Sequence, residues 1–237
     1  MNPQQLATGQ TVSFLGDVLR GRQHVLEVGC GRGEVARRLA ASGLAITALD
    51  RKLSDRTPAA NVSYVERDFL EYDGGPFDAV VFTASLHHIA PLSAAIDRAY
   101  RVLVPGGLVV ADEFDLDAPN RETLRWYYDA MDLLAAAELF PRDRVDPPAS
   151  DVIERWRLAH HHEPALHTGV AMRRAIAERF DLRDVHGAAY LYRYLTRHLP
   201  SDARGVAVAQ HIYMTERRGI TDGTLAAVGL GIVAERA

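Results

Sequence analysis

Three glycines on alternate positions, Gly29, Gly31 and Gly33, directly follow the apolar run of residues 25–28. Glycine has no Cβ and readily adopts positive φ, so this spacing lets the chain turn tightly and lets a ligand lie on its backbone. Apolar residues at helical spacing follow over residues 35–40. The sequence therefore predicts a strand, a nucleotide-binding turn and a helix.

The spacing of these glycines differs from that of a dinucleotide-binding turn, G-x-G-x-x-G, in which the third glycine comes one residue later. The chain also holds one lysine, Lys52, so the Tyr-x-x-x-Lys pair of short-chain dehydrogenases cannot be assembled. Both observations argue against a nicotinamide-dependent reductase.

Carboxylates end the next two apolar runs of the chain. Asp50 follows residues 44–49, roughly the 20-residue interval at which a βαβ unit presents an acid to a ribose diol. Asp68 closely follows the run 62–65. An isolated acid is more often a solvated loop residue. The carboxyl ends of parallel strands meet at one edge of a sheet, however, so we expect both acids to face a ligand.

Two histidines follow the clearest strand pattern, residues 77–82. His87 and His88 lie in the segment 83–89 that leaves this strand, where an open parallel sheet binds its ligands. Because histidine titrates near neutrality, either residue could act as a general base. The alternative is that one of them braces the helix that follows.

These segments, in this order, resemble the successive motifs of the class I S-adenosylmethionine-dependent methyltransferases. The resemblance lies in E-x-G-x-G-x-G from Glu27 to Gly33, in Asp50, in Glu66-Arg67-Asp68-Phe69 and in Leu103-Val104-Pro105-Gly106-Gly107-Leu108-Val109. The tetrapeptide Leu-His-His-Ile over residues 86–89 is similar to that of the natural-product and quinone-type enzymes of the small-molecule branch.

The resemblance implies an α/β fold, a Rossmann-like seven-stranded mixed sheet with helices on both faces and a helical insertion after the fifth strand. It places the last strand antiparallel beside the fifth. It implies S-adenosylmethionine as the cofactor, with Asp50 on the ribose, Asp68 on the adenine amine and Phe69 beside the ring. The expected cofactor-binding residues are Glu27, Gly29, Cys30, Gly31, Gly33, Asp50, Arg51, Asp68, Phe69, Thr83, Ala84 and Leu86.

An acidic segment, residues 112–117, follows the fifth expected strand. Hard oxygen ligands of this kind suit a divalent metal, but no partnering Asn-Asp pair is evident, and we expect no metal. The other interpretations are that Asp112 or Glu113 orients the methyl acceptor, or that the acids are solvated. We take Glu113 as a candidate acceptor-binding residue.

Residues 119–180 show mostly helical spacing, interrupted by prolines, with Ser150 and Thr168 as expected helix caps. The aromatic stripe that includes Trp126 and Tyr127 either packs on the domain or lines the acceptor pocket. The triplet His160-His161-His162 cannot converge on one metal ion, because adjacent helical residues point about 100° apart.

Two further residues are candidates for contact with the acceptor. His167 either reaches the pocket or lies at a helix entry. Tyr190 alternates with two more tyrosines at 192 and 194, and in an extended segment all three share a face, as an aromatic wall or an exposed edge. The expected acceptor-binding residues are thus Glu113, Trp126, Tyr127, His167 and Tyr190.

With 237 residues, 48% of them apolar, the chain suits one α/β domain with an insertion. We expect an N-terminal helical cover (1–20), a cofactor-binding core (21–115), a helical insertion or lid (116–180) and a part that completes the sheet (181–237). The insertion suits a dimer interface as well as a lid, so a homodimer is one expectation.

The formal net charge of −4 and the scattered arginines lack the basic patch of a nucleic-acid-binding protein. Cys30 is the single cysteine, which excludes an intramolecular disulfide, and the longest apolar run, residues 225–234, is too short to span a bilayer. The start of the sequence does not resemble a signal peptide. We expect a cytoplasmic protein that binds neither nucleic acid nor membrane.

The functional hypothesis is methyl transfer from S-adenosylmethionine to a small organic acceptor, at oxygen, nitrogen or carbon, by in-line displacement. Residues 83–89 lack the Asn/Asp-Pro-Pro-Tyr motif, which argues against exocyclic amines of DNA or protein glutamine as acceptors. The alternative is a non-catalytic module that binds S-adenosylmethionine as a regulator or assembly partner.

Overall fold

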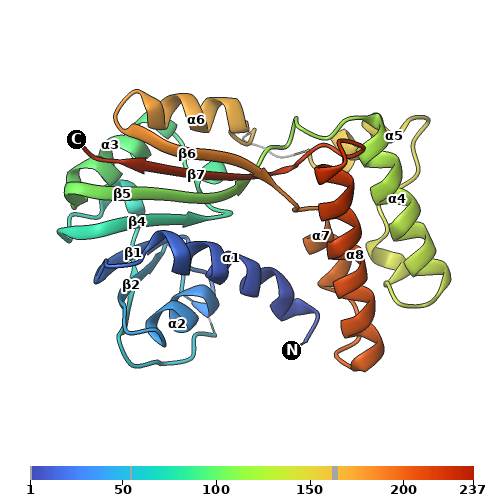
Figure 1. Cartoon of the computed structure of the whole chain (residues 1–237), viewed down its shortest axis with the longest axis horizontal. Helices are drawn as coiled ribbons and strands as arrows, with labels where there is room; N and C mark the ends of the chain where they lie inside the picture. The colour runs from blue at the N-terminus through green and yellow to red at the C-terminus, as the bar shows by residue number, and fades with distance from the viewer. Residues whose placement is uncertain (1, 54, 162–164) are drawn as a thin grey trace. The chain divides into compact units, whose positions relative to one another are not determined.

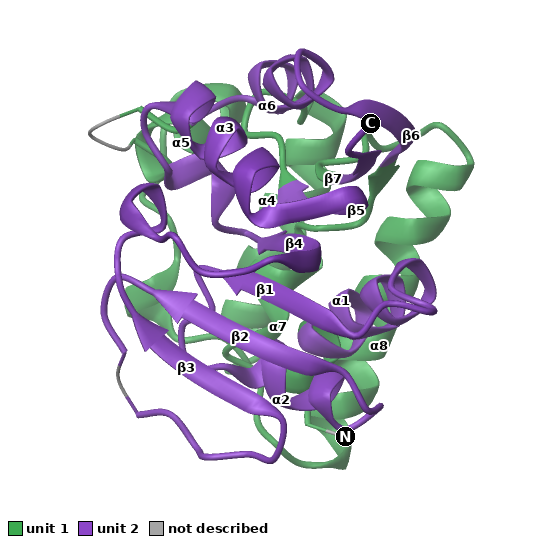
Figure 2. Cartoon of the chain, turned by 90° about the vertical axis from the view of Figure 1, so that its left-hand side faces the viewer, with its two compact units in different colours: residues 1–7, 114–166, 187–229 green, residues 8–113, 167–186, 230–237 purple. Residues whose placement is uncertain are grey.

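A computed structural model describes residues 2–53, 55–161 and 165–237 of the chain. The chain forms two compact units, each built from segments distant in sequence (Figure 2). Unit 1 comprises residues 1–7, 114–166 and 187–229, and unit 2 comprises residues 8–113, 167–186 and 230–237.

Seven strands of the described chain form one sheet, in the order β3-β2-β1-β4-β5-β7-β6 (Figure 1). Their bounds are β1 His24–Val28, β2 Ala45–Asp50, β3 Val62–Glu66, β4 Phe77–Thr83, β5 Leu103–Phe114, β6 Asp181–Ala188 and β7 Gly229–Glu235. Strands β1 to β5 pair in parallel. The strands at the centre, β1 and β4, are nearly continuous apolar runs, as expected for parallel strands that are buried on both faces.

Strand β7 runs antiparallel to β5. The Gly106 N–H donates to the Arg236 carbonyl at 2.9 Å, and the Arg236 N–H donates to the Gly107 carbonyl at 2.8 Å. Farther along, the Asp115 N–H donates to the Val228 carbonyl, so the partner number falls as the β5 number rises. The expected mixed sheet, with its last strand antiparallel beside the fifth, is confirmed.

Helices cover both faces of the sheet in unit 2 (Figure 1). On one face, α3 (Leu92–Val102) and α6 (Gly169–Ala177) pack on alternate strand residues such as Leu26. On the other face, α1 (Gln4–Val18) and α2 (Glu34–Ala40) pack on the neighbouring residue Val25. Successive strand residues point to opposite faces, and each face therefore has its own apolar core.

Unit 1 is mainly helical. It holds α4 (Arg121–Ala136), α5 (Val152–Ala159), α7 (Tyr192–Thr196) and α8 (Ala203–Thr221), with a short 3₁₀ turn at Arg142–Arg144. An apolar core joins them and includes fully or almost fully buried Leu124, Trp156 and Leu195. None of the helices in the described ranges is long and apolar enough to cross a membrane.

The segment between β6 and α7 differs from the extended segment that the alternating tyrosines predict. Strand β6 ends at Ala188, and α7 begins at Tyr192. The buried carboxylate of Glu216 accepts the backbone N–H groups of Tyr190, Leu191 and Tyr192 at 2.8, 2.9 and 2.7 Å. This carboxylate holds the chain in a turn, so the three tyrosines do not share a strand face.

The helix caps agree in part with the sequence pattern. Thr168 caps α6 as expected, since its hydroxyl accepts from the Ala171 N–H at 3.2 Å. The cap of α5 is Asp151, whose carboxylate accepts from the Ile153 N–H at 2.8 Å. Ser150, the expected cap, donates instead to the Glu154 carboxylate. The prediction for α5 is wrong by one residue.

Candidate functional site

The loop between β1 and α2 forms a glycine cradle. Gly29, Gly31 and Gly33 all have positive φ, of 77°, 53° and 70°. A Cβ on Gly29 would lie 2.5 Å from the Ser85 Cβ, and one on Gly33 would lie 2.5 Å from Tyr64 Cε1. A Cβ on Gly31 would meet no atom within 4 Å. Packing therefore requires glycine at 29 and 33, whereas Gly31 faces open space that a ligand could occupy.

Asp50 lies beside this cradle at the end of β2. Its Oδ2 accepts from the Gly31 N–H at 2.8 Å and its Oδ1 from the Lys52 N–H at 3.2 Å. An ionised carboxylate has about four acceptor positions, so Asp50 retains capacity for ligand hydroxyls. Strand register pairs Asp50 with Glu66 on β3, which brings the two strand ends together as the spacing predicts.

Asp68 begins the 3₁₀ turn η1 (Phe69–Glu71), where it accepts from the Leu70 N–H at 2.9 Å. Its other oxygen lies 3.4 Å from the Nε of exposed Arg51. The structure thus joins Arg51 and Asp68 at the same edge as Asp50. Phe69 is buried in the core, edge to face with Phe82 at 5.6 Å between ring centroids, and has 3% of its surface exposed.

Glu27 is a buried carboxylate in the centre of the sheet, 1% exposed. Its Oε1 accepts from the Thr83 hydroxyl at 3.3 Å, and its Oε2 has no hydrogen-bond partner among the described residues. Burial raises the pKa of Glu27 to about 7, and the Thr83 hydrogen bond offsets only part of this effect. A buried carboxylate with an unsatisfied oxygen is costly, and such groups are concentrated at functional sites.

Cys30 follows the first glycine of the cradle and is largely buried. Burial, reinforced by the neighbouring carboxylates Glu27 and Asp50, raises the pKa of the Cys30 thiol to about 12. Only the thiolate is a good nucleophile, so this burial disfavours nucleophilic reactivity of Cys30.

Hydrogen bonds to the neighbouring strands fix the segment that leaves β4. Ala84 adopts φ of 51°, and its N–H donates to the Asp112 carbonyl at 2.9 Å. The Ser85 hydroxyl donates to the Val28 carbonyl at 2.6 Å. Leu86 is fully buried in the core. The side chains of Leu86 and Phe69 thus lie in the apolar core, and their contact with a cofactor stays a prediction.

Glu113 and His87 form a buried pair. Oε2 of Glu113 lies 2.5 Å from Nδ1 of His87, and its Oε1 accepts from the backbone N–H groups of Ser85 and Leu86 at 2.8 and 2.7 Å. Glu113 is 0% exposed and His87 is 4% exposed. His88 is exposed, with its ring centroid 4.1 Å from that of His87. The structure thus separates the two histidines by environment.

The interpretation of residues 112–117 as solvated loop acids is wrong for the first two. Strand β5 continues to Phe114, which buries both Asp112 and Glu113. Asp112 accepts from the Thr11 hydroxyl at 2.5 Å. The buried carboxylate of Glu113 faces His87 and the loop backbone. Its expected contact with an acceptor stays a prediction.

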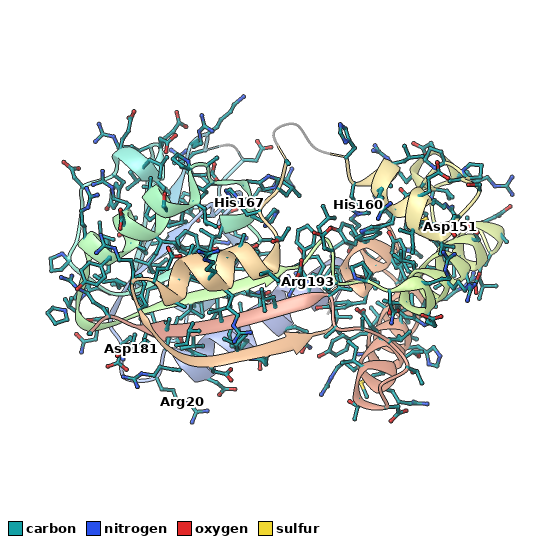
Figure 3. All side chains as sticks on the ribbon, turned by 90° about the horizontal axis from the view of Figure 1, so that it is seen from above. Arg20, Asp151, His160, His167, Asp181 and Arg193 are labelled. Carbon is teal, nitrogen blue, oxygen red and sulfur yellow. The ribbon has the colours of Figure 1, made fainter. Side chains whose placement is uncertain are left out.

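His167 joins the same loop from the segment that leads into α6 (Figure 3). Its N–H donates to the His87 carbonyl at 3.0 Å, and its Nε2 lies 3.0 Å from the Ile89 carbonyl. Because a carbonyl only accepts, Nε2 carries the proton in this contact. The structure places His167 as a clamp on residues 87–89, which the sequence pattern did not predict.

The remaining expected acceptor-binding residues lie in unit 1. Tyr127 is buried, with its ring edge to face with Trp156 at 5.8 Å, and Trp126 is half-buried. Tyr190 is buried and stacks on Phe114 at 4.9 Å between centroids. Their packing within unit 1 is clear, and their contact with an acceptor stays a prediction.

No group of three or more metal-ligating side chains occurs among the residues that the structure describes. His160 stacks on Trp156, with 3.6 Å between the ring centroids. His162, the last member of the histidine triplet, lies outside the described residues.

Comparison with known proteins places this chain in a family. The family model of a methyltransferase domain matches residues 4–147, more than half of the chain. An uncharacterized methyltransferase of Mycobacterium tuberculosis is 36% identical over 102 residues, which cover 40% of this chain and 52% of that protein. The 27-O-demethylrifamycin SV methyltransferase of Amycolatopsis mediterranei is 33% identical over 109 residues, which cover 40% of each chain. The chain spans about half the length of the curated relatives that it matches.

Solved structures are similar over almost the whole chain. An S-adenosylmethionine dependent methyltransferase from Mesorhizobium loti has a TM-score of 0.56 at 14% identity, covering 94% of this chain and 96% of that one. A Burkholderia thailandensis 1,6-didemethyltoxoflavin-N1-methyltransferase, solved with S-adenosylhomocysteine, has a TM-score of 0.56 at 18% identity, covering 98% of this chain and 79% of that one. At these identities the likeness concerns the fold.

Proposed function

Since the chain belongs to the methyltransferase domain family of class I S-adenosylmethionine-dependent enzymes, we propose that it transfers a methyl group from S-adenosylmethionine to a small organic acceptor. In this proposal His87 is the general base and Glu113 positions it. The observation that carries the catalytic part is the buried contact of 2.5 Å between Glu113 Oε2 and His87 Nδ1.

The residues of the glycine cradle fit the proposed cofactor. S-adenosylmethionine, when bound, supplies a methyl group already activated by its sulfonium. Open space above Gly31 leaves the backbone accessible, and the acceptor capacity of Asp50 suits a ribose diol. The unsatisfied Oε2 of Glu27 offers an acceptor for a hydrogen-bond donor of the cofactor. Asp68 and the backbone of residues 83–86 complete the proposed site.

His87 is well placed for proton transfer by its partners. The Glu113 carboxylate holds the Nδ1 side of the ring, so a proton from the acceptor would enter at Nε2. Glu113 would then stabilise the imidazolium, as the orienting carboxylate of a catalytic triad does. Because both side chains are buried, little water competes for this contact.

The loop that carries His87 is fixed on two sides. Glu113 accepts the N–H groups of Ser85 and Leu86, and His167 donates to the carbonyls of His87 and Ile89. Methyl transfer from an activated donor depends chiefly on alignment, with the reacting atoms about 3–3.5 Å apart. We propose that Glu113 and His167 are positioning residues for this loop.

The proposal that the acceptor is a small organic molecule is supported by the names of the relatives, and not by the geometry of the glycine cradle. The names of the relatives include 27-O-demethylrifamycin SV methyltransferase and ubiquinone/menaquinone biosynthesis C-methyltransferase, whose acceptors are small molecules. The formal net charge of −4 further disfavours a polyanionic acceptor.

The experiment is an acceptor screen with S-adenosylmethionine, in which S-adenosylhomocysteine is measured by mass spectrometry. We expect a small acceptor that raises its formation, and a loss of turnover of about 10²-fold or more in His87→Asn. His88→Asn is the matched control, because this neighbouring histidine is exposed. Turnover that His87→Asn leaves unchanged contradicts the role of His87. A protein that binds the cofactor but never turns over would instead be a non-catalytic module.

A further inference from the structure

The segment before α5 carries a carboxylate that the protein itself does not satisfy. Oδ2 of Asp146 is buried, and no hydrogen-bond donor reaches it among the residues that the structure describes. No arginine, lysine or histidine of the described ranges forms an ion pair with this carboxylate. An unpaired carboxylate oxygen is costly to bury unless a further group provides a donor. The residue as a whole is partly exposed, so a ligand can reach it from solvent.

Three tyrosines lie around the Asp146 carboxylate. Burial raises the pKa of Tyr127, Tyr128 and Tyr194, and the negative charge of Asp146 contributes to the increase in each. Charges act on a pKa mainly over short distances, so all three side chains lie near this carboxylate. The carboxylate also acts on the Tyr128 hydroxyl as a nearby acceptor.

The Tyr128 hydroxyl is the second polar group without a partner. Its oxygen is buried, it does not reach hydrogen-bond geometry with Asp146, and no other partner occurs in the described part of the chain. Both oxygens can accept hydrogen bonds. A ligand with several N–H donors and a positive charge would therefore satisfy both oxygens and compensate the charge of Asp146.

The surroundings of these two oxygens are aromatic. Tyr127 lies edge to face with Trp156 and with Tyr194, at 5.8 and 6.3 Å between ring centroids, and Trp156 lies 6.3 Å from Tyr194. The three ring planes are nearly perpendicular to one another, at 89°, 73° and 81°. The face of an aromatic ring carries negative potential and attracts cations, and its apolar surface suits the organic part of a ligand.

One cation of the chain already lies on this cluster. The Arg155 guanidinium is 4.0 Å from the centroid of the Tyr128 ring. It donates to the backbone carbonyl of Asp146 at 2.9 Å and pairs with the Asp132 carboxylate at 3.3 Å. Because Asp132 is the carboxylate that pairs with Arg155, the Asp146 side chain keeps an uncompensated charge.

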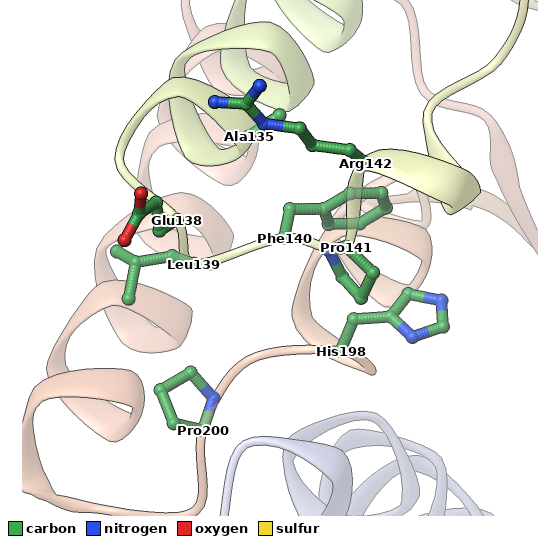
Figure 4. A pocket seen from close by; sticks show the side chains of 8 residues that line it. All are labelled: Ala135, Glu138, Leu139, Phe140, Pro141, Arg142, His198 and Pro200. Carbon is green, nitrogen blue, oxygen red and sulfur yellow. The ribbon is translucent and has the colours of Figure 1, made fainter.

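The pocket at the end of α4 differs from this arrangement (Figure 4). Its lining residues are 135, 138–142, 198 and 200. The Arg142 guanidinium is turned toward Ala135 and away from the His198 ring, so the charged groups there do not converge. Asp146 and the aromatic cluster are separate from this lining.

We propose that Asp146 and the aromatic cluster of Tyr127, Tyr128, Trp156 and Tyr194 bind a small organic ammonium ion, a primary or secondary amine that carries an apolar group. Its N–H groups would donate to Asp146 Oδ2 and Tyr128 Oη, and its apolar part would pack against the rings. The whole site belongs to unit 1. It includes Tyr127, an expected acceptor-binding residue, but the proposal does not require that the bound amine be methylated.

The test is a calorimetric and NMR titration of the full chain at about pH 7 with phenethylamine, which is protonated at this pH, and with 2-phenylethanol as its uncharged counterpart. We expect phenethylammonium to bind with a dissociation constant of about 1 mM or tighter. 2-Phenylethanol should bind at least about tenfold more weakly, since it lacks the charge. The N,N,N-trimethyl derivative should also bind more weakly, because it has no N–H donor.

The Trp156 indole reports where the ligand binds. Its Nε1 donates to the Leu116 carbonyl at 3.0 Å, which fixes the ring in the cluster. The chain has two tryptophans, so Trp126→Phe assigns the two indole N–H signals. We expect phenethylammonium to shift the Trp156 signal.

Two variants remove the proposed polar contacts one at a time. Asp146→Asn should weaken phenethylammonium binding about tenfold or more, through loss of a charge-assisted contact. Tyr128→Phe keeps the ring beside Arg155 and should weaken binding about threefold. The control Asp143→Asn removes an equal charge from an exposed residue nearby, one that pairs with Arg144, and should have no effect.

Thermal unfolding of the ligand-free protein separates a binding role from a structural one. Asp146→Asn should not lower the melting temperature, because the carboxylate has no hydrogen bond or ion pair to lose among the described residues. A clear loss of stability relative to Asp143→Asn would show that the protein itself uses this carboxylate, and would contradict the proposal.

The binding data would overturn the proposal in any of three ways: equal affinity for 2-phenylethanol, affinity that Asp146→Asn leaves unchanged, or an unshifted Trp156 signal. Absence of phenethylammonium binding up to about 10 mM would do the same. Titration with S-adenosylhomocysteine in the same samples tests the cofactor site separately, so failure of this proposal leaves the proposed methyl transfer unaffected.

Discussion

Glu113 and His87 lie 2.5 Å apart, Oε2 to Nδ1, although 26 positions separate them in sequence. Strand β5 carries the carboxylate to the end of β4, from which the His87 loop emerges. The register of two neighbouring parallel strands therefore creates the pair.

Glu113→Gln should distinguish the role of Glu113 in positioning His87 from its role in stabilising the fold. The glutamine can still accept from the Ser85 and Leu86 N–H groups through its carbonyl oxygen. Its NH₂ group would then face His87 Nδ1 and favour the opposite tautomer. We expect turnover to fall about 10²-fold with little change in cofactor affinity, measured by initial rates and calorimetry. A variant that loses both equally would indicate a general structural defect.

His167→Phe should loosen the His87 loop from the other side. It removes the Nε2 contact with the Ile89 carbonyl but keeps the backbone N–H that donates to the His87 carbonyl. We expect faster amide hydrogen exchange at residues 87–89 and a lower kcat. Substitution of exposed His186, which pairs with Asp184, is the control. Unchanged exchange at these amides would argue against the clamp.

The glycines of the cradle should differ in what their substitution affects. Gly29→Ala places a Cβ 2.5 Å from the Ser85 Cβ, whereas Gly31→Ala meets no atom within 4 Å. We expect Gly29→Ala to lower the free energy of unfolding by more than about 2 kcal/mol, through overpacking and positive φ. Gly31→Ala should cost only about 1 kcal/mol, the strain of positive φ, but should weaken S-adenosylhomocysteine binding. Denaturant unfolding and calorimetry measure the two effects, and equal stability losses would contradict this division.

Glu27 should make the stability of the ligand-free protein depend on pH. Burial raises its pKa from 4.5 to about 7, so the folded state binds the proton more tightly than the unfolded state. The contribution of Glu27 to the free energy of unfolding is fully present below the pKa that this residue has in the unfolded state. It is lost as pH rises through the pKa that Glu27 has in the folded state. The loss is about 3 kcal/mol.

Glu27→Gln should remove this pH dependence and weaken cofactor binding. The control Glu34→Gln changes a partly exposed acid of α2 that pairs with Arg38. The pH dependence of the stability of this variant should follow that of the unmodified protein. Unfolding curves between about pH 5 and pH 8 measure the effect. A Glu27→Gln profile that still falls with pH would show that another group is responsible.

The sheet could be predicted well from the sequence because buried parallel strands are short apolar runs. The glycine turn, Asp50 and Asp68 also follow from their places after these runs. Glu113 could not be assigned in the same way, since a charged residue at a strand end has the same local pattern as a loop. Its burial depends on His87 and on two N–H groups of a distant loop.

The turn at Tyr190 shows the same limit. Alternating tyrosines favour a strand locally, but Glu216 on α8 captures three consecutive N–H groups and bends the chain. These hydrogen bonds link residues that are 24 to 26 positions apart in the sequence. Local secondary-structure propensity therefore cannot predict them. His167 is a similar case, because its partners are the carbonyls of His87 and Ile89.

The most direct measurement is isothermal titration calorimetry of the protein with S-adenosylhomocysteine, alongside Asp50→Ala and with NADH as a control ligand. We predict micromolar binding that Asp50→Ala weakens by about tenfold or more, since the carboxylate joins the cradle to the ribose. NADH should not compete. No binding of S-adenosylhomocysteine, or binding of NADH alone, would contradict the proposed cofactor site and with it the proposed methyl transfer.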